Sequence, residues 1–240
     1  AAFYASILSL NLEKGSNVLL SRMTFPSVIT IVKNLKLNID FFDIDKDFQP
    51  ILNTSKNNLN YKLIIVTHPF GFFCDFNKLK SLMNSNTKLI FDSSHAQGLK
   101  YKSKYLNEYS NISFVSIQGQ KAISGGEGGF ILTDEFDLYK KMINQHHPGH
   151  TENIFSKNYA GVSSSLKLRM HPLASVIASE NINIFHKKNE KLKKKIKQIY
   201  EKIIKFENID IPNFDYEKIS GFHYGLPFYF KKKKENLNWP

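Results

Sequence analysis

The stretch Ser116-Ile-Gln-Gly-Gln-Lys121-Ala-Ile-Ser-Gly-Gly-Glu-Gly-Gly129 decides how this sequence is interpreted. It predicts a strand that ends near Ile117, a loop of small residues that carries Lys121, and a second strand that begins at Gly129. Lysine is a costly residue for a buried loop, because its ammonium group must leave water. Burial also lowers the pKa of the amine, so a lysine held in such a loop is typical of a Schiff-base nucleophile.

An acid and a histidine end another predicted strand, in Leu89-Ile-Phe-Asp92-Ser-Ser-His95. Pyridoxal phosphate needs an amine, an acid that keeps its pyridine nitrogen protonated, groups that hold its phosphate, and a flat group over its ring. Lys121 can supply the amine and Asp92 the acid. Ser116 can bind the phosphate, and His95 or Phe25 can cover or orient the ring. The two stretches together therefore indicate a pyridoxal phosphate enzyme.

Each of these residues, taken alone, also has an ordinary structural interpretation. Asp92 could cap a turn after a strand, and His95 could be a structural histidine. The glycines after Lys121 could form only a flexible turn, because a short Gly-rich match is weak evidence. The order and spacing of the whole set favour the cofactor site over these separate interpretations.

The rest of the chain predicts an α/β fold. Short apolar runs rich in β-branched residues alternate with amphipathic stretches, which is typical of a mostly parallel mixed sheet covered on both faces. The predicted strands are Asn17–Leu20, Ile39–Ile44, Leu63–Thr67, Lys88–Phe91, Ile112–Ile117 and Phe130–Thr133. The predicted helices are Phe3–Leu12, Ser27–Asn34, Asn77–Asn84 and Phe136–Asn144. In such sheets ligands bind at the carboxyl ends of the strands, where the candidate residues are expected to converge.

The pattern changes near Pro172, from which a long helix is predicted to about Phe206. Short strands are predicted after it at Ile209–Ile211 and Phe222–Phe230. We therefore assign residues 1–170 to a large domain, and residues 171–240 to a linking helix and an incomplete small domain. The chain begins without Met, inside a helical pattern, and we expect a fragment truncated at both ends.

Composition limits the class of protein. The net charge of +12 raises the hypothesis of a nucleic-acid partner. Many of the lysines, however, lie on one face of the predicted long helix, which is typical of a solvated surface. The opposite face carries the apolar residues Leu192, Ile196, Ile199 and Ile203. The basic run has few interleaved aromatics and no nucleic-acid motif, so we expect no nucleic acid as a partner. No apolar run is long enough for a membrane span, and the single Cys74 fits a reducing compartment, so we expect a cytoplasmic protein without a membrane partner.

Several stretches resemble a known family. Phe91-Asp-Ser-Ser-His-Ala-Gln-Gly98, Phe114-Val-Ser-Ile-Gln-Gly-Gln-Lys121 and Gly126-Glu-Gly-Gly129 are similar to the DegT/StrS family of pyridoxal-phosphate-dependent nucleotide-sugar aminotransferases. Weaker similarities are found in Met23-Thr-Phe-Pro26, in Thr67-His-Pro-Phe-Gly71 and in Leu168-Arg-Met170. The resemblance covers roughly residues 1–230 and implies the large domain of a fold-type-I transferase, followed by part of a small α+β domain.

This resemblance implies a role for each candidate residue. Lys121 would be the Schiff-base lysine and proton shuttle, and Asp92 the partner of the pyridine nitrogen. His95 would lie beside the cofactor, Ser116 would bind its phosphate, and Phe25 would stack on its ring. The implied reaction moves an amino group, usually from glutamate, to a keto-sugar on a nucleoside diphosphate, for cell-surface polysaccharides or deoxyaminosugars.

The sequence departs from the family pattern in two places. The phosphate-binding Gly-Thr step of the family would precede Ala1 and is absent. The family's Asn, which reaches a neighbouring subunit's phosphate, is replaced by Lys167, whose ammonium can act as a point charge. The resemblance implies a homodimer with Lys167 near the interface.

Other functions stay open at this point. His146, His147 and His150 lack acidic or cysteine partners at ligand spacing, so we expect no metal. A dehydratase or another fold-type-I enzyme is an alternative, although the sugar-dehydratase branch of the family has histidine in place of the lysine. A non-catalytic basic protein, such as a degraded paralogue, is the other alternative.

Overall fold

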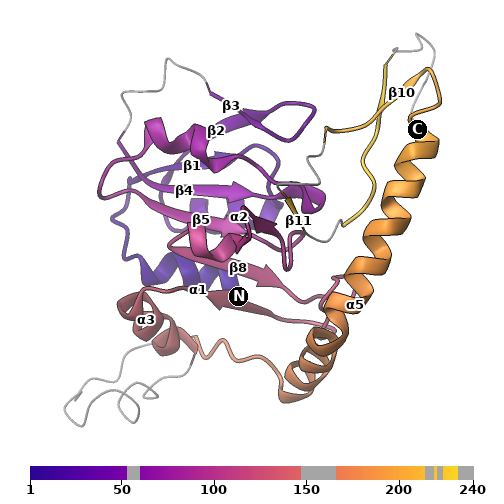
Figure 1. Ribbon diagram of the computed structural model, residues 1–240. Coiled ribbons are helices and arrows are strands. Elements are labelled where there is room, and N and C mark those ends of the chain that lie inside the picture. Colours follow the sequence, from indigo (N-terminus) through magenta and orange to yellow (C-terminus); the bar gives the residue numbers. More distant parts are fainter. Residues whose placement is uncertain (53–59, 147–165, 214–218, 221–223, 232–240) are drawn as a thin grey trace, which may run out of the picture.

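The computed structural model of the chain describes residues 1–52, 60–146, 166–213, 219–220 and 224–231. Its centre is a seven-stranded sheet with the strand order β3-β2-β1-β4-β5-β8-β9 (Figure 1). The strands of this sheet are β1 (Asn17–Ser21), β2 (Asn38–Ile44), β3 (Pro50–Ile51), β4 (Tyr61–Thr67), β5 (Lys88–Asp92), β8 (Ile112–Ser116) and β9 (Gly129–Leu132).

The sheet is mixed but mostly parallel. The neighbouring strands β2, β1, β4, β5 and β8 run parallel, and β3 and β9 pair antiparallel at the two edges. The predicted α/β fold with a mostly parallel mixed sheet is therefore confirmed. The strand order reverses between β1 and β4, and such a reversal opens a crevice at the carboxyl edge, where ligands bind in open α/β sheets.

Both faces of the sheet are buried, which explains why its strands have nearly continuous apolar sequences. Along β4, Leu63 and Ile65 belong to one core cluster, and Ile64 and Val66 belong to another. The first cluster includes side chains of the helices α1 (Ala2–Ser9), α2 (Pro26–Asn34) and α3 (Phe136–His146). The second includes side chains of a 3-10 helix, η3 (Phe76–Leu82), and of the segment between β5 and β8.

The element η3 corrects one sequence prediction. An α-helix was expected over Asn77–Asn84, but the chain forms a 3-10 helix that begins after Asp75. Phe76, Leu79 and Leu82 are all buried there, at a spacing of three residues. Three residues per turn is the period of a 3-10 helix, so this geometry keeps all three side chains on the core side.

The helix α5 (Pro172–Ile203) confirms the predicted long helix and ends three residues earlier than expected. In its first half, Ala178 and Phe185 pack against Ile117 and Ile123, which lie on either side of Lys121 in the chain. Its second half buries Ile196 and Tyr200. Tyr200 is buried where the sequence pattern placed Ile199, which is 39% exposed. No helix in the described ranges is long and apolar enough to cross a membrane.

Short strands follow α5. β10 (Ile209–Asp210) pairs with β12 (Tyr229–Phe230), so only the end of the strand expected at Phe222–Phe230 forms a ladder. β11 (Ile219–Ser220) pairs with the hairpin of β6 (Lys100–Tyr101) and β7 (Lys104–Tyr105), none of which the sequence analysis predicted. These pairings join the last part of the chain to the segment after β5. The proposed domain boundary near residue 170 stays a prediction.

Candidate active site

The candidate residues follow strands that end at one edge of the sheet. β1, β4, β5 and β8 are parallel, so the residues after Ser21, Thr67, Asp92 and Ser116 meet at the carboxyl edge. The hydroxyl groups of Thr24 and Thr67 lie 3.2 Å apart and join the loop after β1 to the end of β4. The fold thus brings the predicted residues to the carboxyl edge of the sheet, the edge at which such sheets bind ligands.

Asp92, the last residue of β5, is a buried acid. Its side chain is almost fully enclosed, and its Oδ1 accepts a hydrogen bond from the backbone N–H of Ser94 at 3.0 Å. Burial raises the pKa of Asp92, while the bond from Ser94 and the positive charge of Lys121 oppose that rise. A buried carboxylate is stable only beside a cation, and Lys121 is the cation whose charge acts on it here.

Lys121 is carried by the loop between two paired strands. Ser116 at the end of β8 pairs with Gly129 at the start of β9, so both ends of the loop are fixed by the sheet. Burial lowers the pKa of the Lys121 amine, and the charge of Asp92 partly offsets this effect. A lowered pKa leaves more of the amine unprotonated at neutral pH, which is what a nucleophilic lysine requires.

His95 lies close enough to Lys121 for the two charges to interact. Its Nδ1 accepts a hydrogen bond from the backbone N–H of Phe70 at 3.3 Å, so the proton of the neutral ring is on Nε2. Burial, and then the positive charge of Lys121, lower the pKa of His95 to about 4. At neutral pH this side chain is therefore a neutral hydrogen-bond donor and not a second cation.

Tyr224 joins this cluster although no sequence pattern singled it out. Its ring stacks on that of His95, with the centroids 4.1 Å apart and an angle of 18° between the planes. Nζ of Lys121 lies 4.4 Å from the centroid of the same ring, as in a cation–π contact. Its backbone N–H also donates to the carbonyl oxygen of Phe70 at 2.8 Å. A lone tyrosine in a late segment carries no motif, so its role becomes visible only in the fold.

Phe70 itself has an unusual backbone. Its φ is 53°, in the left-handed region that is uncommon for a bulky residue. In this conformation its N–H bonds His95 and its carbonyl bonds Tyr224. The two hydrogen bonds hold this strained residue in place, and strain of this kind is concentrated at functional sites.

Ser116 is half-buried at the end of β8. Its Oγ accepts a bond from the backbone N–H of Gln118 at 3.3 Å, and its N–H donates to Oγ of Ser94 at 3.2 Å. Ser116 is thus tied to the turn after Asp92, and its hydroxyl can still donate a hydrogen bond.

Phe25 and Lys167 are placed less closely. Phe25 precedes α2 at the same sheet edge and its side chain is 68% exposed, so its ring is available to stack on a ligand. Lys167 is exposed, with φ of 52°, in the segment that leads from α3 to α5. Neither Phe25 nor Lys167 takes part in the contacts described above for Asp92, His95 and Lys121.

The glycines after Lys121 have a packing role in addition to any flexibility. A Cβ added to Gly125 would lie 2.6 Å from the carbonyl oxygen of Ala174, in the first turn of α5. Gly126 has φ of +86°, which favours glycine. The loop is therefore shaped to lie directly against α5, which the turn interpretation alone did not predict.

The histidine group considered as a metal site is only partly described. His146 ends α3, whereas His147 and His150 lie outside the described residues. Within the described ranges no group of three His, Cys, Asp or Glu side chains could hold a metal ion.

These residues fit pyridoxal phosphate by the chemistry of their side chains. A buried carboxylate beside a cation suits a pyridinium nitrogen, and a lysine of lowered pKa suits an aldehyde. Ser116 adds a hydroxyl at the strand end, and Phe25 adds an exposed ring. The cluster thus offers an amine, an acid, a hydroxyl and an aromatic ring at one edge of the sheet.

The chain belongs to the DegT/DnrJ/EryC1/StrS aminotransferase family, whose model matches residues 1–236. Pyridoxal phosphate is the cofactor of this family, in agreement with the sequence interpretation. Among curated relatives, GDP-perosamine synthase of Escherichia coli O157:H7 is 29% identical over 146 residues, which is 59% of this chain and 40% of that protein. Protein MosB of Rhizobium meliloti is 28% identical over 59% of this chain and 29% of its own length. The matched part thus spans less than half of these relatives.

Solved structures share the fold. The aminotransferase from Psychrobacter cryohalolentis matches with a TM-score of 0.83 and 20% identity, over 99% of this chain and 65% of its own. The E. coli GDP-4-keto-6-deoxy-D-mannose-3-dehydratase with bound hydrated pyridoxal phosphate matches with a TM-score of 0.84 and 17% identity, over 98% of this chain and 66% of its own. The fold is therefore that of fold-type-I pyridoxal phosphate enzymes.

Proposed function

We propose that this chain belongs to a pyridoxal-phosphate-dependent aminotransferase that transfers an amino group, from glutamate, to the keto-sugar of a nucleotide sugar. The observation that carries the proposal is the cluster of Lys121, Asp92 and His95 at the carboxyl edge of the sheet. The charge of Lys121 shifts the pKa values of Asp92 and His95, and the charge of Asp92 shifts the pKa of Lys121. Family membership supports the reaction class, and the similarity to a GDP-perosamine synthase supports the substrate class.

Pyridoxal phosphate supplies, when bound, an electron sink for the carbon that carries the amino group. Asp92 would face the ring nitrogen, and the hydrogen bonds from Ser94 and the charge of Lys121 oppose the rise in its pKa that burial causes. Lys121 would hold the cofactor through its amine and would carry the proton of the reacting carbon. His95 donates from Nε2 without adding a positive charge, because its pKa is about 4.

Three further residues complete the proposed site. Ser116 binds the phosphate through its hydroxyl, and Phe25 covers the ring. Lys167 approaches the phosphate of a neighbouring subunit in a homodimer. The exposed apolar side chains of Leu173, Val176 and Ile177 on the first turns of α5 support such a pairing, because a surface of this kind is costly in water.

The lysine at position 121 supports transamination over dehydration. A lysine amine can both hold the cofactor and act as the base that moves a proton of the substrate carbon. The family resemblance implies histidine at this position in sugar dehydratases. The two activities are distinguished by whether the product from a nucleotide keto-sugar contains nitrogen.

The test uses the full-length protein. After incubation with pyridoxal phosphate and borohydride, peptide mass spectrometry should find the reduced cofactor on Lys121. With glutamate and a GDP-linked 4-keto-sugar, we expect an amino-sugar nucleotide and 2-oxoglutarate in equal amounts. Cofactor on another lysine, or consumption of the keto-sugar without incorporation of nitrogen, would contradict the proposal.

A further inference from the structure

Gln97 is a buried polar residue that none of the roles above uses. It lies in the turn after β5, two residues beyond His95, and its side chain is 4% exposed. Burial of an amide without partners is costly, so its hydrogen bonds show what the side chain stabilises.

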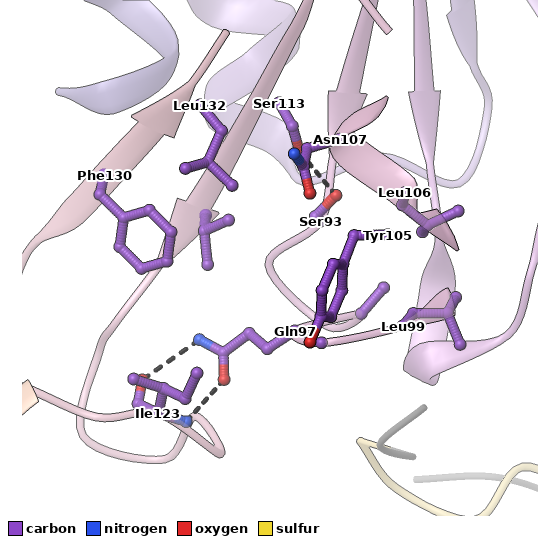
Figure 2. Close-up of a pocket in the computed structure, with 13 residues that line it drawn as sticks. Ser93, Gln97, Leu99, Tyr105, Leu106, Asn107, Ser113, Ile123, Phe130 and Leu132 are labelled. Carbon is purple, nitrogen blue, oxygen red and sulfur yellow. Dashed lines mark hydrogen bonds between the residues drawn. The ribbon is translucent and has the colours of Figure 1, made fainter. Parts of the chain in front are cut away.

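All three of these hydrogen bonds go to the backbone around Lys121. Nε2 donates to the carbonyl oxygens of Ser116 at 2.8 Å and Ile123 at 3.1 Å, and Oε1 accepts from the N–H of Ile123 at 2.6 Å. Figure 2 shows the amide of Gln97 directed at Ile123, with both of the bonds to that residue drawn. The anchored positions lie on the two sides of Lys121, at the end of β8 and two residues after the lysine.

Many of the other hydrogen bonds of this loop stay within it. The N–H of Lys121 bonds Gln118, and the N–H of Gly125 bonds Ile117. These bonds shape the loop but do not fix it relative to Asp92. Gln97 links the loop to Asp92, because it lies in the segment that directly follows Asp92 and contains His95, and because it bonds the backbone on both sides of the lysine.

The small cavity beside Gln97 gives the loop somewhere to move. It has a volume of about 60 Å³ and is lined by residues that include Gln97, Ile123, Ser93 and Val115, whereas Lys121, Asp92 and His95 are not part of its lining (Figure 2). Without the hydrogen bonds of Gln97, the Ile123 end of the loop can shift toward this space. The packing of the loop against α5 therefore leaves its side toward this cavity unfilled.

We propose that Gln97 is a positioning residue that fixes the Lys121 loop relative to Asp92 through its three backbone hydrogen bonds, and so directs the lysine amine toward the cofactor. This inference rests on the proposed function for its consequence, but the positioning itself is a property of the chain without cofactor. Gln97 contacts neither reacting atoms nor cofactor in this role.

The matched control is Gln49, which has the same kind of contacts elsewhere. Its Nε2 donates to the carbonyl oxygens of Asp47 and Phe73, and its Oε1 accepts from the N–H of Asp75. Gln97→Met and Gln49→Met both remove one donor pair and one acceptor while keeping a side chain of similar length. Gln97→Glu is a harsher variant, because its carboxylate still accepts from Ile123 but faces two carbonyl oxygens to which it cannot donate.

The first measurement follows the amine in the intact protein freed of cofactor. Lys121 is labelled with acetic anhydride over a range of pH, and the labelled peptide is quantified by mass spectrometry. In Gln97→Met we expect the apparent pKa of Lys121 to rise toward its ordinary value, because water reaches a loop that is no longer held. In Gln97→Glu the pKa of Lys121 should rise at least as much, because the new carboxylate adds a negative charge near the amine. In Gln49→Met it should match the wild type, although the free energy of unfolding of that variant also falls.

The second measurement is the rate at which pyridoxal phosphate is captured on Lys121, trapped with borohydride at pH 7.5. We expect Gln97→Met to capture pyridoxal phosphate about tenfold more slowly than the wild type. A tenfold change in rate corresponds to about 1.4 kcal/mol, which is the net contribution of one or two hydrogen bonds. Unchanged labelling and capture in Gln97→Met, or equal changes in Gln49→Met, would overturn the proposal and leave Gln97 with a structural role only.

Two arms keep the outcomes separable. If Gln97→Met does not fold, hydrogen exchange of the wild type still decides, because the Ile123 N–H must be protected although it lies outside any helix or strand; rapid exchange there overturns the proposal. If the wild type captures no cofactor on Lys121, the proposed function fails, while the labelling of the cofactor-free variants still tests the positioning.

Discussion

The ring of Tyr224 lies on the ring of His95 at a centroid distance of 4.1 Å and shields it from water. These residues are far apart in the sequence, and the backbone bond between Tyr224 and Phe70 helps to hold them together. Because burial is the larger cause of the lowered pKa of His95, the tyrosine should control the charge of that histidine.

Tyr224→Ala should therefore raise the pKa of His95 from about 4 toward its ordinary value of 6.5, since solvent returns to the imidazole. Tyr224→Phe keeps the ring and should leave the pKa nearly unchanged. The measurement is a proton NMR titration of the His95 ring, assigned with His95→Asn. A pKa near 4 in Tyr224→Ala would show that the tyrosine does not cause the desolvation.

Lys121→Ala should abolish transamination, because it removes both the attachment of the cofactor and the proton shuttle. A positioned proton-transfer group is worth about 10²–10⁴-fold, and the loss should be at least that large. The same variant should also raise the pKa of His95, because the positive charge of Lys121 contributes to its lowering. Amino-sugar formation measures the first effect, and the NMR titration measures the second without cofactor.

Asp92→Asn should separate activity from stability. Burial raises the folded-state pKa of Asp92 above 3.8, so the folded state binds more protons than the unfolded state just above that pH. Stability due to this group is then lost as the pH rises through the folded-state pKa, and the neutral amide avoids that loss. We expect the cofactor-free variant to be at least as stable as wild type in urea at pH 7.5, and its transamination to be strongly reduced. A variant with wild-type activity would rule out the charge of Asp92 as the partner of the pyridine nitrogen.

His68 should make the chain sensitive to acid. It is fully buried after β4, its Nδ1 accepts from the N–H of Cys74 at 3.1 Å, and burial lowers its pKa to about 3. The unfolded state binds the proton near pH 6.5, so the folded state loses stability as the pH falls from 6.5 toward 3. His68→Asn keeps an acceptor for Cys74 without titrating. Urea unfolding at pH 7.5 and pH 5 should show that the free energy of unfolding falls less on acidification in this variant than in the wild type. An equal fall would show that other groups cause the loss of stability in acid.

Val176→Asp should test the proposed homodimer. Val176 is 61% exposed on α5, so a charge there costs little within one subunit but would be buried in an interface formed by this face. We expect the intact variant to elute as a monomer in size-exclusion chromatography with light scattering, with the unfolding of its subunit unchanged. Ser179→Asp, at a neighbouring exposed position, serves as the control. A dimeric Val176→Asp would place the interface elsewhere.

Much of the sheet could be predicted because its strands are buried on both faces and therefore apolar throughout. The runs that became β1, β4, β5 and β8 were recognised to within a few residues, and with them the positions of Asp92 and Lys121. The two-residue strands β3, β6, β7 and β11 could not be predicted, because ladders so short depend on what the fold places beside them.

The site was predictable only where a residue follows a strand. Asp92, His95 and Lys121 have that position, and their roles stay predictions although their charges interact in the fold. Tyr224 and Gln97 could not be found in this way, because each acts through a partner distant in sequence: a histidine ring for the tyrosine, and the Ser116 and Ile123 backbone for the glutamine. Long-range contacts of single residues leave no periodic signal.

The antiparallel pairing of β8 with β9 has a consequence for how this part of the chain can vary. Because Ser116 and Gly129 are paired, the connection between them is a closed loop whose ends stay together whatever its length. The entropy of closing a loop grows slowly, by about 0.6 kcal/mol for each doubling of length, so added residues would change the cost of loop closure little. They would, however, move Lys121 away from Asp92. Insertions in this loop that leave its contacts with α5 intact should therefore reduce the proposed activity more than they reduce stability.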